Sequence, residues 1–184
     1  SEKRTVEDED DDLPEVEDVD QVSVPATIAE TVGIVLGLIL FNVYPELIGI
    51  YNFSDTGSSF MPVLSAAFFS YMPWINLLWA LQIGLNLWLL QQMRWHAGTR
   101  WFWVAIKAGG IALAYAMLIG SSIVSITPEA LTANLNFPAD AAQILATMFS
   151  QGVKIALVIS IVAGAFEILK TIVQMVRRTV PATA

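Results

Sequence analysis

Long, nearly uncharged apolar runs are the feature that most constrains the fold of this chain. A helix needs about 20 apolar residues to cross the hydrocarbon of a bilayer, which is about 30 Å thick. We expect such spans at about residues 26–43, 74–93, 101–126 and 153–176. Only 14% of the residues are charged, against about 25% in soluble domains. The sequence therefore predicts an all-α integral membrane bundle of about four transmembrane helices within residues 25–184, with the lipid bilayer as its surroundings.

A shorter apolar segment, residues 60–72, precedes the second span. Its length is insufficient to cross a bilayer. Helical spacing would place Phe60, Leu64, Phe68 and Tyr71 on one face, a pattern typical of a helix that lies at the lipid surface. We therefore expect an extra interfacial or re-entrant helix here, with Pro73 starting the second span.

The last helix is expected to run from residue 139 to residue 178, about 60 Å, which is twice the thickness of the hydrocarbon. Two helix-start signals lie before it, Thr127 ahead of Pro128 and Pro138 ahead of Ala139. We expect its first turns to stand outside the lipid and to pack on residues 60–72.

Residues 1–24 form an acidic run, with eleven of the 17 acidic residues between Glu2 and Asp20. Such a run cannot bury enough apolar surface to fold alone, so a flexible tail or linker is predicted. An alternative is a docking strip for a basic partner or a cytoplasmic regulator. The charge excludes nucleic acid as a partner. Because Ser1 is not a methionine, we expect further residues upstream.

The basic residues indicate the orientation in the membrane. Arg94, Arg100 and Lys107 flank the connection between the second and third spans, and Lys170, Arg177 and Arg178 end the fourth. Residues 44–73 and 127–139 contain no Lys or Arg, and Lys154, at the opposite end of the fourth span, is the exception. By the positive-inside rule, both termini and the 94–100 turn are expected in the cytoplasm.

Small residues recur at every fourth position in the spans, a spacing that lets helix backbones approach closely in lipid. The same stripes are equally suited to covering by a partner subunit. The candidate packing or partner positions are Gly33, Gly37, Ala112, Ala116, Gly120, Ser160 and Gly164.

Polar residues inside a membrane are candidates for function because they are costly to bury there. The intramembrane polar candidates are Glu30, Asn76, Asn86, Lys154 and Glu167. Structural roles are also open to them: Glu30 near a helix start, Lys154 extending towards water, and Glu167 paired with Lys170 three residues later. Interhelical hydrogen bonds are expected of Asn76 and Asn86, with Gln82 away from both.

No catalytic or metal-binding pattern is present in the sequence. The chain has no cysteine and one histidine, His96, which excludes thiolate chemistry and leaves too few ligands for a zinc site. Nucleophile–base pairs and glycine-rich phosphate loops are also absent. We therefore expect no enzyme activity and no cofactor.

Residues 72–118 resemble the membrane region of bacterial proteins of the HAAS-domain type. The similar residues are Ile75 to Trp79, Leu85 to Leu87, Arg94-Trp95 and Thr99-Arg100-Trp101, together with residues 39–52. The resemblance covers about residues 26–126. It implies an anti-sigma-like or signalling regulator of the bacterial inner membrane, with a helical cytoplasmic module upstream.

Three hypotheses for function follow from these observations. The first is a non-enzymatic membrane signalling or regulatory module that anchors a cytoplasmic domain. The second is an accessory subunit of a larger membrane complex. The third is a small transporter or channel, which would need several ionisable groups at matched depth that the sequence does not reveal.

Overall fold

The computed structural model describes residues 20–54 and 57–179 of the chain. The described elements are α1 (Val24–Asn42), a 3-10 turn (Pro45–Leu47), β1 (Gly49–Ser54), β2 (Gly57–Pro62), α2 (Ala66–Gln92), α3 (Ala97–Ile119), α4 (Pro128–Leu135) and α5 (Ala139–Thr179). Four of the helices, α1, α2, α3 and α5, are long and apolar enough to cross a membrane. The predicted all-α bundle of four long helices is confirmed, and the strands add only one small hairpin.

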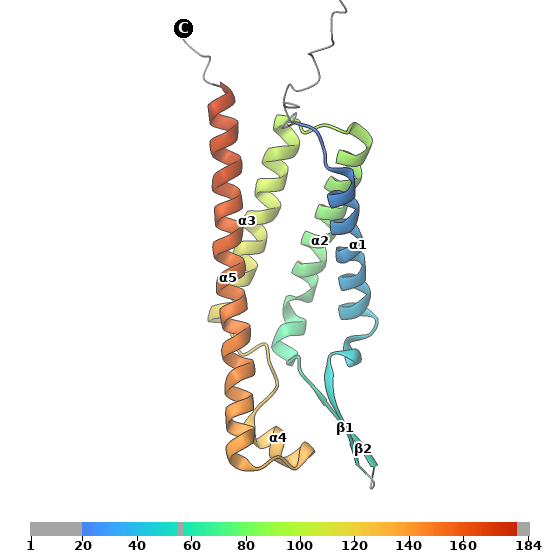
Figure 1. Cartoon of the computed structure of the whole chain (residues 1–184), viewed down its shortest axis with the longest axis vertical. Coiled ribbons are helices and arrows are strands. Elements are labelled where there is room, and N and C mark those ends of the chain that lie inside the picture. The colour runs from blue at the N-terminus through green and yellow to red at the C-terminus, as the bar shows by residue number, and fades with distance from the viewer. Residues whose placement is uncertain (1–19, 55–56, 180–184) are drawn as a thin grey trace, which may run out of the picture.

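The four long helices run alternately up and down (Figure 1). In the described part of the chain, α1 packs on α2, α2 on α3, and α3 on α5. The start of α1, the α2–α3 turn and the end of α5 therefore lie at one end of the molecule, here called the terminal end. The β-hairpin and α4 lie at the other, the hairpin end.

The first long helix begins as its sequence predicts. Pro25 lies in the first turn of α1, where the missing proline N–H costs no helical hydrogen bond. The helix ends at Asn42, one residue before the expected boundary.

The third span, expected at residues 101–126, is shifted towards the N-terminus. It begins at Ala97 because the backbone N–H of His96 donates to the Thr99 hydroxyl at 3.0 Å, which starts the helix. It ends at Ile119, followed by Gly120 in extended conformation. Beyond it, the backbone of Ile123 accepts from the Ser65 N–H at 3.0 Å, so residues 120–126 form an extended connection. Only residues 94–96 of the expected 94–100 turn lie outside a helix.

The separate interfacial helix predicted at residues 60–72 is wrong. Residues 57–62 form β2, which pairs antiparallel with β1 and sets Tyr51 opposite Phe60. Residues 66–72 are the first turns of α2, which continues through Pro73. Phe60 and Phe68 share no helix because the chain changes from a strand to a helix between them. The prediction overweighted Pro73 as a helix start.

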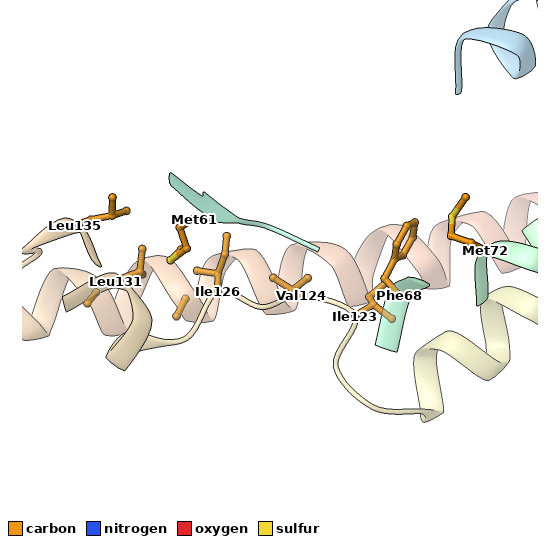
Figure 2. Packing of buried hydrophobic residues seen from close by; sticks show 10 residues of the cluster. Met61, Phe68, Met72, Ile123, Val124, Ile126, Leu131 and Leu135 are labelled. Atoms are coloured by element: carbon orange, nitrogen blue, oxygen red, sulfur yellow. The ribbon is translucent and has the colours of Figure 1, made fainter. Parts of the chain in front are cut away.

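The larger buried apolar cluster of the described residues lies at the hairpin end (Figure 2). Figure 2 shows Met61 of β2, Phe68 and Met72 of α2, and Leu131 and Leu135 of α4 around the connection that carries Ile123 to Ile126. Leu131 is fully buried. Leucine burial of this kind contributes about 2–3 kcal/mol, so this cluster fixes the hairpin and α4 against the long helices.

The two helix-start signals and the long last helix are confirmed. The Thr127 hydroxyl accepts from the N–H of Ala130 at 3.2 Å and caps α4. The last helix, α5, runs from Ala139 to Thr179. Its first turns place Ala142 and Ala146 in the same cluster as Phe68 and Met72, as expected.

Candidate functional site: a polar cavity between the long helices

All four long helices line one cavity of about 500 Å³. Ligand pockets of roughly 300–1,000 Å³ are typical of small-molecule sites. Its wall is mostly apolar and includes Ile34, Ile75, Leu78, Trp79, Ile106, Ile111 and Leu113. Four polar side chains with charged or amide groups face it as well, namely Glu30, Gln82, Lys107 and Glu167. The cavity thus combines an apolar wall with a few polar groups.

Lys107 and Glu167 form an ion pair across this cavity wall. The Lys107 Nζ lies 2.9 Å from the Glu167 Oε2 and joins α3 to α5. The same Nζ lies 5.1 Å from the centroid of the Trp103 ring, a favourable cation–π distance. Glu167 was expected to pair with Lys170 on its own helix, and the pair with Lys107 corrects this. The sequence gives no sign of which helix lies beside Glu167.

The ion pair lies near the middle of a span. Lys107 stands roughly 15–18 Å from either end of α3 at a helical rise of about 1.5 Å per residue. It therefore does not flank the α2–α3 turn, as the orientation argument had assumed. A charge at this depth in hydrocarbon is costly unless it is paired, and Glu167 supplies the partner.

A second set of polar contacts joins α1 to α2. The Asn86 Nδ2 donates to the Thr31 hydroxyl at 3.1 Å and to the Glu30 Oε2 at 3.3 Å. The Gln82 Nε2 donates in turn to the Asn86 Oδ1 at 3.1 Å. The expectation that Gln82 lies away from Asn86 is wrong, because side chains four residues apart share a helix face. Asn86 and Gln82 are both buried.

Asn76 makes the other interhelical bond expected from the sequence. Its amide exchanges hydrogen bonds with Asn42, with Asn76 Nδ2 donating at 2.7 Å and Asn42 Nδ2 donating at 3.0 Å. This pair joins the hairpin-end halves of α1 and α2, and neither residue lines the cavity. Lys154 also lies elsewhere, exposed beside a smaller hollow that Ser121 and Ser122 line.

The small-residue candidates divide between contact and open positions. A Cβ on Gly37 would meet Trp79 at 2.9 Å, and one on Gly164 would meet Ile111 at 3.1 Å, so both allow close helix approach. The Tyr71 hydroxyl donates to the Ala116 carbonyl at 3.2 Å beside Gly120. Gly33 has open space around it. Ser160 lines the cavity, and Ala112 and Ala116 line an outer groove between α2 and α3.

The end of the acidic run is bound to the α2–α3 turn. The Asp20 Oδ1 lies 2.8 Å from the Arg100 Nη2 in an ion pair, and the Trp95 N–H donates to the Asp20 carbonyl at 2.8 Å. The Val22 N–H donates to the Met93 carbonyl at 3.2 Å. The Val22 side chain is buried against Leu85, Leu89 and Ile106. We call these contacts the N-terminal clamp.

The clamp corrects the predicted extent of the flexible tail. Residues 20–23 are bound to the bundle and Val24 starts α1, whereas residues 1–19 lie outside the described part. Arg100 is buried although charged, and its position 5.7 Å from the Trp95 ring centroid adds a cation–π contact. Trp95 and Arg100, which belong to the Arg-Trp and Thr-Arg-Trp segments of the sequence, therefore contribute directly to the clamp.

The described residues contain no group of three or more His, Asp or Glu side chains that could hold a metal ion. His96 lies exposed at the start of α3. The polar contacts observed at the cavity are charge pairing and hydrogen bonding.

The comparisons with protein-family models, curated proteins and solved structures gave no match. The HAAS-type resemblance thus stays a prediction. The fold itself defines the class, a multi-pass membrane protein with four candidate membrane-spanning helices. In this chain the four helices line a cavity that contains an ion pair near the middle of α3.

A double-mutant cycle tests the ion pair. Lys107→Met and Glu167→Leu alone each leave one charge unpaired in the span, so each is expected to lower the free energy of unfolding in lipid or detergent. The double variant should recover much of the loss, with a coupling energy of about 1–3 kcal/mol. Denaturation of the purified chain followed by circular dichroism measures this. Strictly additive losses would show that the two side chains do not interact.

Proposed function

We propose that this chain is a non-enzymatic membrane regulatory module that couples its N-terminal segment to a four-helix bundle. The N-terminal clamp carries this proposal. A simple anchor needs only a flexible connection, whereas Asp20 and Val22 are fixed to the α2–α3 turn by an ion pair, two backbone hydrogen bonds and a buried side chain. Any rearrangement of α2 and α3 would therefore move the base of the acidic run.

The clamp also lies close to the cavity in the structure. Ile106 packs against Val22 in the terminal-end cluster and lines the cavity one residue before Lys107. A change at the cavity can thus reach the N-terminal segment through adjacent packed residues. This continuity provides the physical route that the proposed coupling requires.

The orientation that fits this role places both termini in the cytoplasm of a bacterial cell. Arg94, Arg100 and Arg177 belong to the terminal end, residues 44–73 and 127–139 carry no Lys or Arg, and Lys154 is the exception towards the hairpin end of α5. This distribution follows the positive-inside rule for an inner-membrane protein. The acidic run would then face cytoplasmic proteins, among which a basic regulator is the complementary partner.

A protease experiment checks the orientation. Protease added to spheroplasts is expected to leave the acidic run intact and to cut it only after the membrane is opened, because the terminal end faces inward. Immunoblotting with a tag ahead of Ser1 reads the cleavage. Removal of the tag from sealed spheroplasts would reverse the assigned topology.

The alternative function, an accessory subunit of a larger complex, has one observation in its favour. An apolar groove of about 430 Å³ lies on the outside of α2 and α3 and is lined by Ala112, Ala116 and the exposed Trp74. Grooves of small residues and aromatic side chains are suited to a neighbouring membrane helix.

Site-specific photo-crosslinking separates the two functions. A crosslinking residue at Val16, in the acidic run, is expected to capture a soluble cytoplasmic protein, and Asp20→Ala should change the yield because the clamp is lost. The same crosslinking residue placed at Ala112, in the outer groove, tests the alternative function. Capture of membrane subunits in fixed stoichiometry from Ala112, with none from Val16, would favour the accessory subunit and contradict a regulatory module.

A further inference from the structure

We propose that the cavity between the long helices is a binding site for a lipophilic cation, an organic ammonium or phosphonium with apolar substituents. The proposal concerns a ligand and does not depend on the regulatory role, which rests on the N-terminal clamp instead. Three properties of the cavity support it: its net charge, its apolar wall and its accessible carboxylate.

The charged groups of the cavity do not balance. Lys107 is neutralised by Glu167 at 2.9 Å, and the Trp103 ring further satisfies its ammonium. Glu30 is the remaining charged group of the cavity. When it is ionised, the cavity carries a net charge of −1, because two carboxylates face one ammonium.

Glu30 keeps capacity to hold a cation. Its one hydrogen bond in the described structure is the 3.3 Å contact from the Asn86 amide, whereas a carboxylate accepts at about four lone-pair positions. The Gln82 amide and the Thr31 hydroxyl hold the Asn86 side chain in place. Glu30 is exposed to the cavity. A cation that enters the cavity therefore meets an oriented carboxylate without breaking an existing ion pair.

The wall favours an apolar cation over a hydrated metal ion. Ile34, Ile75 and Ile111 offer no oxygen ligands, and the metal-ligand clusters that a bare ion would require are absent from the described residues. Trp79 lines the same cavity and contacts Gly37. Trp79 therefore adds an aromatic surface to the apolar wall, and aromatic rings attract organic cations.

The volume of the cavity and its apolar wall limit the size and the polarity of a ligand. About 500 Å³ accommodates a small drug-sized molecule. A hydrophilic amine would lose hydration against the apolar wall, whereas a cation shielded by apolar groups loses little. An anion would face the uncompensated Glu30 charge and be excluded.

Equilibrium dialysis with tetraphenylphosphonium tests the proposal. The purified full chain in uncharged detergent micelles is expected to bind this cation saturably, with about one site per chain. Tetraphenylborate has the same shape and the opposite charge, and it should show no saturable binding. Absence of saturable phosphonium binding, or equal binding of the two ions, would overturn the proposal.

Two matched variants locate the site. Glu30→Gln should weaken phosphonium binding at least tenfold, because the cavity loses the one carboxylate that is not held in the Lys107–Glu167 ion pair. Glu129→Gln removes an exposed carboxylate from the first turn of α4 at the hairpin end and should leave binding unchanged. Equal affinities of the Glu30 variant and the unaltered chain would assign any binding to micelles or another surface.

Circular dichroism and gel filtration establish that the Glu30 variant folds. If it does not, the cation–anion comparison on the unaltered chain decides the matter alone. Failure to bind phosphonium while Val16 still crosslinks to a cytoplasmic protein would remove the ligand and leave the regulatory role standing.

Discussion

Hydrocarbon supplies no hydrogen bonds, so each polar side chain along a span needs a partner inside the protein. Two such pairings hold this bundle in register. Asn86 joins α2 to Thr31 and Glu30 of α1, and Lys107 joins α3 to Glu167 of α5. The cavity lies between the two pairings, because the same helices that carry them form its wall. The arrangement of the long helices therefore depends on polar contacts within the spans as well as on apolar packing.

The two ends of the molecule have different construction. At the hairpin end, Leu131 and Met61 belong to a buried apolar cluster that resembles the core of a soluble domain. At the terminal end, Arg100 and Asp20 form a half-buried ion pair that fixes the chain entering α1. Buried ion pairs often serve specificity rather than stability. Apolar packing therefore dominates at the hairpin end, whereas the terminal end combines a smaller apolar cluster with charge pairing and backbone hydrogen bonds.

Sequence reasoning recovered the elements that depend on local signals. The four long helices, the proline at the start of α1 and the Thr127 cap all follow from hydropathy and capping rules. It failed where neighbours in space decide. Lys107 appeared to flank a turn because the span was placed four residues late, and its pairing with Glu167 needs α3 beside α5. The hairpin was missed because Phe60 and Phe68 also fit helical spacing.

The depth of Lys107 in the bilayer tests the account most directly. The chain has no cysteine, so a nitroxide attached to the Ala108→Cys variant is its single label. Ala108 is the residue next to Lys107, and the label therefore reports the depth of Lys107. In lipid vesicles, spin relaxation by oxygen should be strong and relaxation by a water-soluble nickel chelate weak at this position. A label on Gly98→Cys, near the start of α3, should show the reverse. Strong relaxation by the nickel chelate at residue 108 would place the ion pair in water and contradict the account.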